Sequence, residues 1–198
     1  MDRRRVLLAF GGTSLLAACA ADPPPRPATP VAAGTLPPAT PIRLDVGAVD
    51  VGEAHSPADA PTFIDKRRTQ ELVDASRGML QAKIQATGGP GHARATIERA
   101  SMVERPREVA GGVRGFFLRQ PDIDLVGDLA VRLAVIGEGG TERAYATAEV
   151  NMSRGVLEST SIAERDRIAE QLVQDMLMQL ERSLRQSVDE GLGDYRSS

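Results

Sequence analysis

One residue of this chain has both the type and the setting for an assignable chemical step. Cys19 is the only cysteine among 198 residues, and it directly follows Leu16, Ala17 and Ala18 at the end of an apolar run. A cysteine thiolate is a strong nucleophile, so Cys19 is suited to accept a covalent group. Once Cys19 is modified, no thiol remains for a disulfide or a thiolate metal site.

The other residues that could do chemistry form no convincing set. His55 and His92 are far apart in the sequence, and His55 fits a solvated loop better than a metal site because no second ligand is nearby. Asp122 and Asp124 are a lone carboxylate pair, which is weak evidence of acid–base work or metal binding. The sequence contains neither a P-loop nor a Gly-x-Ser-x-Gly motif. We therefore predict a protein that is not an enzyme and uses no metal or dissociable cofactor.

The N-terminal residues have the pattern of an export signal. Residues 1–5 contain three arginines, and residues 6–18 are a 13-residue run of apolar and small residues, too short to span a bilayer. The order Leu16-Ala17-Ala18-Cys19 resembles the lipobox of bacterial lipoproteins. The resemblance implies that residues 1–18 are a cleaved signal peptide. It also implies that Cys19 becomes the mature N-terminus, with a diacylglycerol thioether and an acyl chain such as palmitate.

Three questions about this region stay open. The alternative to a lipid anchor is a plain secretion signal followed by a buried structural cysteine. Residues 3–7, Arg-Arg-Arg-Val-Leu, loosely resemble a twin-arginine signal, although an ordinary basic region explains them better. Ala20 follows the cysteine where an aspartate tends to retain lipoproteins in the inner membrane, so the resemblance favours the inner leaflet of the outer membrane, facing the periplasm, over the inner membrane.

Composition argues against nucleic acid as a partner. Residues 1–19 hold three arginines and one aspartate, so the rest of the chain carries 21 basic and 26 acidic residues, a net charge of −5. A mildly acidic chain gives no reason to expect the basic surface that binds nucleic acid. Aromatic residues make up 3% of the chain and Trp is absent, so the core must consist of aliphatic residues and Met.

Residues 19–41 are predicted to be a tether between Cys19 and the folded domain. Residues 20–41 contain eight of the thirteen prolines, which exclude a helix or a sheet ladder because proline lacks the backbone donor. Fully extended, these 22 residues reach roughly 70 Å at about 3.1 Å per residue. They are either a spacer that lifts the domain off the membrane or a disordered leader of no required length.

Two early strands are predicted with irregularities. Residues 42–46 alternate apolar and polar side chains, and Val49 and Val51 continue the pattern one residue out of phase. A bulge near Gly47 would account for the change. Residues 93–103 form a second strand whose apolar positions also change phase, so a twist or a bulge is expected there too.

Between these strands, residues 63–86 have the apolar spacing of a helix, which Gly88-Gly89-Pro90-Gly91 ends. Near its start, Lys66-Arg67-Arg68 offers a contact for acidic lipid or a partner. A solvated helix end is the simpler interpretation, because exposed charges are ordinary.

A long irregular stretch over residues 104–124 is the candidate contact surface. Long loops within small domains are often functional. The candidate residues for contact with lipid, lipopolysaccharide or a protein are Arg114, Phe116, Phe117, Leu118 and Arg119. The alternative is that one phenylalanine fills the core and part of the stretch is a strand.

The second half of the domain has the clearest patterns. Residues 125–136 and 143–153 are predicted strands that form a hairpin through the turn at 137–141. Residues 162–190 are a helix that begins with a capping box at Ser161 and Glu164. Its apolar stripe, which we assign to the core, consists of Ile168, Leu172, Met176, Leu180, Leu184 and Val188.

Together these elements predict one α+β domain over residues 42–192, a two-layer sandwich. A mainly antiparallel sheet of about four strands carries two helices on one face, including a long C-terminal helix. Residues 193–198 are expected to be a flexible tail. In layout alone, the chain resembles the lipopolysaccharide-assembly lipoproteins and the auxiliary lipoproteins of ABC-type lipid transporters.

This resemblance implies a non-enzymatic accessory lipoprotein of an envelope assembly or lipid-transport complex, with an envelope protein or a lipid as its partner. The alternative is a free-standing lipoprotein that binds a ligand or a lipid between sheet and helices or under residues 104–124. An enzyme ranks third, because no nucleophile–base pair or metal set is present.

Overall fold

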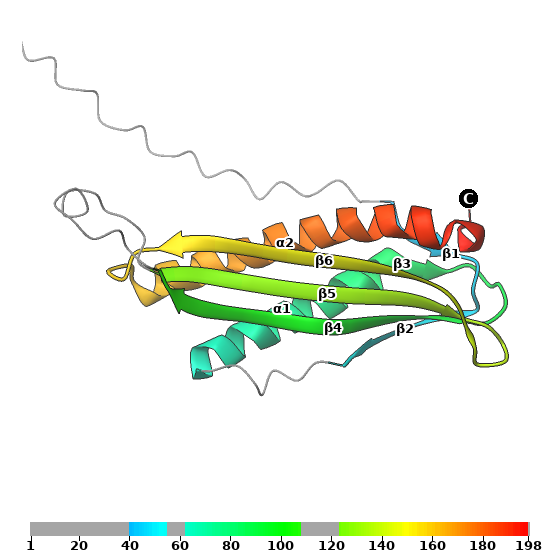
Figure 1. Ribbon diagram of the computed structural model, residues 1–198, viewed down its shortest axis with the longest axis horizontal. Coiled ribbons are helices and arrows are strands. Elements are labelled where there is room, and N and C mark those ends of the chain that lie inside the picture. The colour runs from blue at the N-terminus through cyan, green and yellow to red at the C-terminus, as the bar shows by residue number, and fades with distance from the viewer. Residues whose placement is uncertain (1–39, 55–61, 108–122, 198) are drawn as a thin grey trace, which may run out of the picture. The chain divides into compact units, whose positions relative to one another are not determined.

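The computed structural model describes residues 40–54, 62–107 and 123–197. Its main sheet has four strands in the order β2–β4–β5–β6. The strands are β2 (Ala48–Glu53), β4 (His92–Pro106), β5 (Ile123–Ile136) and β6 (Glu142–Val156). β2 runs parallel to its neighbour β4, whereas β5 is antiparallel to both of its neighbours, β4 and β6 (Figure 1).

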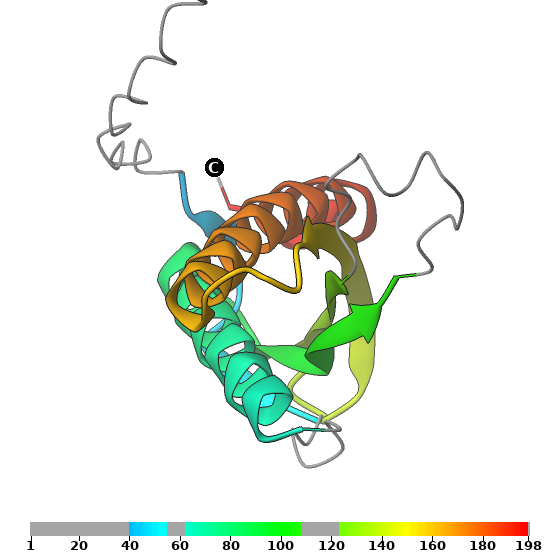
Figure 2. The same cartoon turned by 90° about the vertical axis from the view of Figure 1, so that its left-hand side faces the viewer.

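Two helices cover one face of this sheet. Helix α1 (Phe63–Lys83) and the longer α2 (Ile162–Gly191) both lie on the same side of the curved sheet (Figure 2). A second, two-stranded parallel sheet pairs β1 (Ile42–Leu44) with β3 (Ile84–Ala86). The predicted α+β sandwich with a long C-terminal helix is therefore confirmed.

The β5–β6 hairpin forms where the sequence predicted it. Gly137 donates its backbone N–H to the carbonyl of Thr141 at 2.9 Å, and Gly140 adopts the left-handed region with φ 75°. Along β6, Ala146 and Ala148 are buried against the helix layer, while Tyr145, Thr147 and Glu149 are exposed. This alternation produces one apolar and one polar sheet face.

Helix α2 contributes the predicted apolar stripe to the core. The Ser161 hydroxyl accepts from the backbone N–H of Glu164 at 3.3 Å, which is the expected N-cap contact, whereas the Glu164 carboxylate binds Arg167 instead of reaching back. The buried residues of the helix are Ala169, Leu172, Met176, Leu180, Leu184 and Val188. Their spacing of three to four residues places them on one face.

The predicted irregularity in the strand at 93–103 is confirmed, but the one near Gly47 differs from the prediction. The β4–β5 register shifts between Ile97 and Arg99. Near Gly47 there is no bulge in a continuous strand, because residues 45–47 carry the chain from the small sheet to the large one. A Cβ on Gly47 would lie 3.2 Å from the carbonyl oxygens of Gly89 and Gly91, so the crossing is tight.

Helix α1 ends three residues earlier than predicted. Its last residue is Lys83, and Ile84 is extended, with φ −100° and ψ 126°. Ile84 pairs with Ile42 of β1 and is buried. Tertiary pairing and burial outweigh the local helical pattern that placed Ile84 on the helix face.

The C-terminal residues also differ from the flexible tail that we predicted. Residues Gly193–Tyr195 form the 3₁₀ turn η2, and Leu192 before it is fully buried. Asp45 donates its backbone N–H to the carbonyl of Tyr195 at 2.7 Å, and Arg196 bridges to Leu44. Backbone pairing with the start of the domain holds this segment in place.

Candidate functional site

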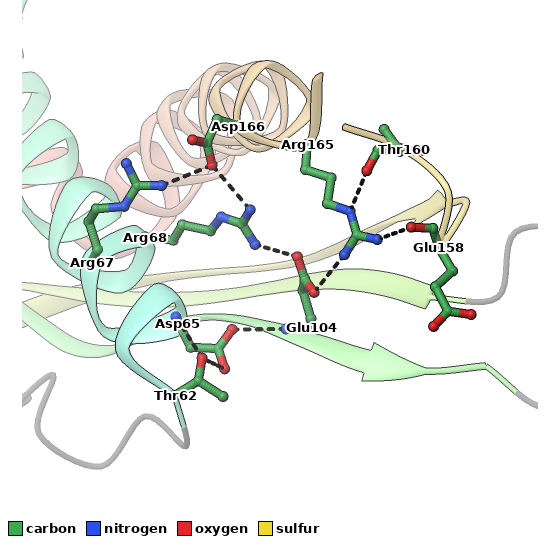
Figure 3. A network of polar contacts seen from close by, with 9 residues as sticks. All are labelled: Thr62, Asp65, Arg67, Arg68, Glu104, Glu158, Thr160, Arg165 and Asp166. Carbon is green, nitrogen blue, oxygen red and sulfur yellow. Dashed lines mark hydrogen bonds and ion pairs between the residues drawn. The ribbon is translucent and has the colours of Figure 1, made fainter. Parts of the chain in front are cut away.

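A cluster of charged side chains joins three elements at one end of the domain. The start of α1, the start of α2 and the last residues of β4 meet there (Figures 1 and 3). The residues involved are Thr62, Asp65, Arg67, Arg68, Glu104, Glu158, Thr160, Arg165 and Asp166. The ion-pair cluster, as used below, means Arg67, Arg68, Glu104, Arg165 and Asp166.

Helix α1 is positioned by side chains that take the place of a neighbouring strand. β2 pairs with β4 only from His92 to Ile97, and no other described strand pairs with the second half of that β4 edge. The Thr69 hydroxyl accepts from the backbone N–H of Met102 at 3.0 Å, and the Asp65 carboxylate accepts from that of Glu104 at 3.1 Å. Two edge donors are thus satisfied by the helix instead of a strand.

Asp65 is fixed from both sides. Its carboxylate also accepts from the hydroxyl of Thr62 at 2.7 Å, and its own backbone N–H donates to Thr62 at 3.1 Å. Thr62 is the N-cap of α1. The Asp65 side chain therefore contacts both the N-cap of the helix and strand β4. Asp65 and Thr69 are both buried.

Arg68 is the centre of the ion-pair cluster. Its side chain is only 3% exposed, yet it carries a full charge. Nη1 donates to Glu104 at 2.6 Å, and Nη2 donates to Asp166 at 3.2 Å. Nε is buried without a hydrogen-bond partner among the described residues. Moving a charged guanidinium from water into the protein interior costs free energy, and ion pairs with two carboxylates offset that cost here.

The start of α2 completes the cluster. Asp166 accepts from Arg67 at 2.9 Å, so one carboxylate binds two consecutive arginines of α1. Arg165 contacts Glu104 at 3.3 Å and donates from Nε to the Thr160 carbonyl at 3.1 Å. It also donates to the carbonyl of Glu158. The loop before α2 is thereby attached to β4.

Two members of the cluster, Arg67 and Asp166, have shifted pKa values. Burial alone would raise the pKa of Asp166, but hydrogen bonds and positive charge from Arg67 and Arg68 outweigh burial and lower the pKa below its ordinary value. The hydrogen bond from Arg67 to Asp166 in turn raises the pKa of the arginine. Both groups stay charged at neutral pH, so this pair holds no proton to transfer there.

This arrangement is suited to holding elements together. Each carboxylate of the cluster is shared between two arginines, which leaves neither oriented as a general acid or base. Within the described ranges, no group of three or more His, Cys, Asp or Glu side chains is placed to hold a metal ion. The observed contacts therefore support a structural clamp between α1, α2 and β4.

Sequence reasoning missed this clamp. We interpreted Lys66-Arg67-Arg68 as a solvated helix end, which is wrong for Arg68 and holds for the exposed Lys66. A signal was present, because Arg68 lies four residues before Leu72 on the apolar stripe of α1. The partner carboxylates on β4 and α2 are 36 and 98 residues away, and no local pattern identifies them.

The candidate contact residues lie outside the described part of the chain. Cys19, Arg114, Phe116, Phe117, Leu118 and Arg119 belong to residues 1–39 and 108–122. His55 and Asp122 also lie outside it. Asp124 is described, and its carboxylate forms an ion pair with Arg107 at 3.6 Å. At least one carboxylate of the Asp122 and Asp124 pair therefore binds an arginine.

A small depression lies at the opposite end of α2. It has a volume of about 40 Å³ and is lined by Ile42, Arg185, Val188, Asp189 and Arg196. Ligand pockets for small molecules are typically about 300–1,000 Å³. This depression is therefore too small for such a ligand.

The helices of the described ranges were also assessed as membrane spans. None of them combines sufficient length with sufficient apolar character to cross a bilayer.

Comparison with known proteins gave structural likenesses only. No protein-family model matches the sequence, and the search of curated proteins found no match. The chain is similar to rare lipoprotein B from Shewanella oneidensis, with 14% identity, coverage of 72% of this chain and 94% of that one, and a TM-score of 0.41.

Two further solved structures are similar at a comparable level. An uncharacterized lipoprotein B from Nitrosomonas europaea has 16% identity, with 77% and 89% of the two chains covered and a TM-score of 0.43. A minor lipoprotein from Acinetobacter baumannii has 12% identity, with 80% and 99% covered and a TM-score of 0.35. The function of this chain has to be argued from its own residues.

Proposed function

We propose that the chain is a membrane-anchored accessory lipoprotein, a non-enzymatic component of an envelope assembly or lipid-transport complex. The observation that carries the proposal is the order Leu16-Ala17-Ala18-Cys19 after a basic and then apolar N-terminus. Cys19 receives the lipid through its thiolate. Ala20 stands where an aspartate tends to retain lipoproteins in the inner membrane, which supports an anchor in the inner leaflet of the outer membrane with the domain facing the periplasm.

Close packing between sheet and helices favours an adaptor over a ligand-binding lipoprotein. Gly127 of β5 faces Met176 of α2 so closely that an added Cβ would lie 2.3 Å from the Met176 sulfur. Met102 and Leu172 are fully buried in the same core. A ligand site between the layers needs a cavity, and these residues occupy that position.

The contact surface that we propose is the segment containing Arg114, Phe116, Phe117, Leu118 and Arg119. The described residues on either side of it are Arg107 and Ile123, and Ile123 pairs with Val156 shortly before α2 begins. Aromatic residues and arginine are enriched where proteins bind each other. The described residues that flank this segment lie at the end of the domain that holds the ion-pair cluster.

The tether enters at the other end. Arg185, near the C-terminal end of α2, donates to the carbonyl of Thr40. Arg165 and Arg185 are twenty residues apart, which corresponds to about 30 Å of helix. Thr40 and the ion-pair cluster therefore lie at opposite ends of the domain, and the tether joins the domain at the Thr40 end.

Co-purification with the full-length lipidated chain tests the proposal. We expect envelope assembly or transport proteins to co-purify, and the Phe116→Ser/Phe117→Ser variant to lose them while remaining folded. Tyr145→Ser is the matched control, because Tyr145 is an exposed aromatic residue on the open sheet face. Recovery of no envelope machinery by the wild-type chain would contradict the proposal. Unfolding of the double variant would instead identify these phenylalanines as core residues.

A further inference from the structure

The backbone hydrogen bonds of the main sheet show which residues of its last strand, β6, face outward. The N–H groups of Met102 and Glu104 in β4 point away from β5, because both donate to side chains of α1. In an antiparallel pair, successive residues of a strand direct their N–H and C=O groups to opposite sides. Val103, between them, therefore faces β5, where its partner is Val126. Val126 in turn faces β4.

The same alternation continues into β6. Gly127, the next residue of β5, faces β6, where its partner is Met152. Met152 therefore faces β5, and its two neighbours in β6 face outward. The β5–β6 register is unbroken from Ile123 to Val135, so the alternation holds along the strand. Four exposed residues direct their N–H and C=O groups away from the sheet, and these groups are called the β6 edge: Thr147, Glu149, Asn151 and Ser153.

The β6 edge has no hydrogen-bond partner within the described ranges. β6 is the last strand of the main sheet, and the outward groups of these four residues take part in no hydrogen bond there. Tyr145 has the same orientation, but its carbonyl meets the end of α2, where an added Cβ on Gly191 would lie 2.7 Å from the oxygen. The opposite edge of the sheet is covered by β2 and α1. The described residues thus cover one edge of the sheet and leave most of the other open.

The sequence of β6 does not protect this edge against pairing. Proteins commonly place proline, lysine or a bulge in an exposed edge strand, which prevents association with another strand. β6 contains neither proline nor lysine, and its pairing with β5 is regular from Ala144 to Val156. Such an edge presents main-chain donors and acceptors at the spacing of a β-strand, so the ligand that fits it is an extended backbone.

The position of α2 argues against a second copy of this chain as that ligand. Arg154 of β6 binds Asp175 of α2 at 2.6 Å, and Gly191 lies at Tyr145, so α2 follows β6 along the edge. Antiparallel pairing of two β6 strands would put both α2 helices on one face of a continuous sheet, over strands only about 4.8 Å apart. Packed helices need about 8–10 Å between their axes. A strand that carries no helix on this face fits instead.

We infer that the β6 edge binds an extended segment of a partner protein, which adds a further strand to the main sheet. The backbone groups of the segment pair with those of the β6 edge, so the segment contains no proline where it donates. The Glu149 side chain is 70% exposed and contacts Arg99 at 3.3 Å, so a basic side chain of the segment fits opposite it. The inference rests on the proposed function, which makes the partner a protein of the envelope complex.

Two substitutions at one position test whether the partner recognises the backbone. Asn151→Pro removes an outward N–H, whereas Asn151→Ala, the matched control, changes the side chain and keeps that donor. Both are made in the full-length, lipidated chain, and proteins bound to it in the cell envelope are co-purified after crosslinking. We expect Asn151→Ala to retain the partner of the wild type and Asn151→Pro to reduce its recovery about tenfold, because strand pairing is interrupted. Thermal unfolding checks that the proline variant folds, since an edge strand tolerates proline at an outward N–H.

Amide hydrogen exchange of the wild-type chain, followed by NMR, decides the question even if the proline variant does not fold. In the chain alone, the outward amides of Glu149, Asn151 and Ser153 should exchange about tenfold faster than those of Val150 and Met152, which face β5. In the purified complex, the exchange of the three outward amides should slow by about tenfold.

The outcomes separate this inference from the proposed function. Slow exchange of the outward amides in the chain alone would mean that a second copy or another part of the chain covers the edge, and would overturn the inference. Equal loss of the partner from both variants would do the same, because it indicates recognition of the Asn151 side chain. If envelope machinery co-purifies fully with a folded Asn151→Pro variant, the proposed function stands and the inference fails. If the protein lost only from Asn151→Pro belongs to no envelope complex, strand pairing stands and the proposed function fails.

Discussion

The guanidinium of Arg68 donates to the Glu104 carboxylate at 2.6 Å, although Arg68 lies inside helix α1 and is almost fully buried. Glu104 is at the end of β4, and the same arginine reaches Asp166 at the start of α2. One buried charge therefore holds three elements that are distant in sequence. The end of the domain at which α1 and α2 begin depends on this contact for its shape.

Arg68→Ala should destabilise the protein by about 2–4 kcal/mol, because it leaves two partly buried carboxylates with fewer donors. Arg67→Ala is the matched control, since the neighbouring arginine is largely exposed and binds the same Asp166. We expect Arg67→Ala to lower the free energy of unfolding by about 0–1 kcal/mol. Urea unfolding followed by circular dichroism measures both values, and equal effects would mean that Arg68 is not the centre of the cluster.

Asp166 should make stability depend on pH in the acid range. Its pKa is lowered in the folded state, so the unfolded state binds protons first and stability falls as pH drops below the ordinary value near 3.8 and through the folded value. Asp166→Asn should make the free energy of unfolding depend less on pH in this acid range. Asp50→Asn, an exposed carboxylate of β2, is the control and should leave the slope as it is in the wild type.

Thr69→Val tests whether α1 replaces a strand along β4. The substitution keeps the side-chain shape but removes the acceptor for the buried N–H of Met102, which should cost about 1–3 kcal/mol. Thr147→Val on the exposed face of β6 should change stability by less than about 0.5 kcal/mol. Hydrogen exchange at Met102 should also accelerate in the first variant, and an unchanged rate would argue against the contact.

The features of the fold that depend on residues close together in the sequence could be predicted from the sequence. The β5–β6 hairpin and the α2 stripe were predicted correctly because their alternation and four-residue spacing are local. The phase change between Ile97 and Ala100 likewise indicated a real register shift. These patterns report burial on one face, which is the property that periodicity measures.

Non-local pairing accounts for the errors. Ile84 has a helical position in the sequence, but its strand pairing with Ile42 depends on a segment more than forty residues earlier. Burial of Arg68 likewise depends on Glu104 and Asp166, which no motif connects to it. The candidate contact residues were predicted from the type of segment in which they lie, and they fall outside the described residues. The ion-pair cluster was visible only in three dimensions.

Gly127→Ala tests whether space remains between sheet and helices. The new methyl group would collide with the Met176 side chain, and overpacking of this kind should cost about 1–3 kcal/mol. Gly139→Ala in the β5–β6 turn is the control, because nothing lies within 4 Å of its added Cβ. A neutral effect of Gly127→Ala would indicate free volume and would favour the ligand-binding alternative.

Lipidation of Cys19 is the claim on which the account depends, and Cys19→Ser tests it most directly. The wild-type chain, expressed in cells fed labelled palmitate, should carry the label and sediment with the outer membrane. The Cys19→Ser chain should be unlabelled and absent from the membrane fraction, because one oxygen replaces the only thiol. Membrane association of Cys19→Ser equal to that of the wild type, or a wild-type chain without label, would contradict the account.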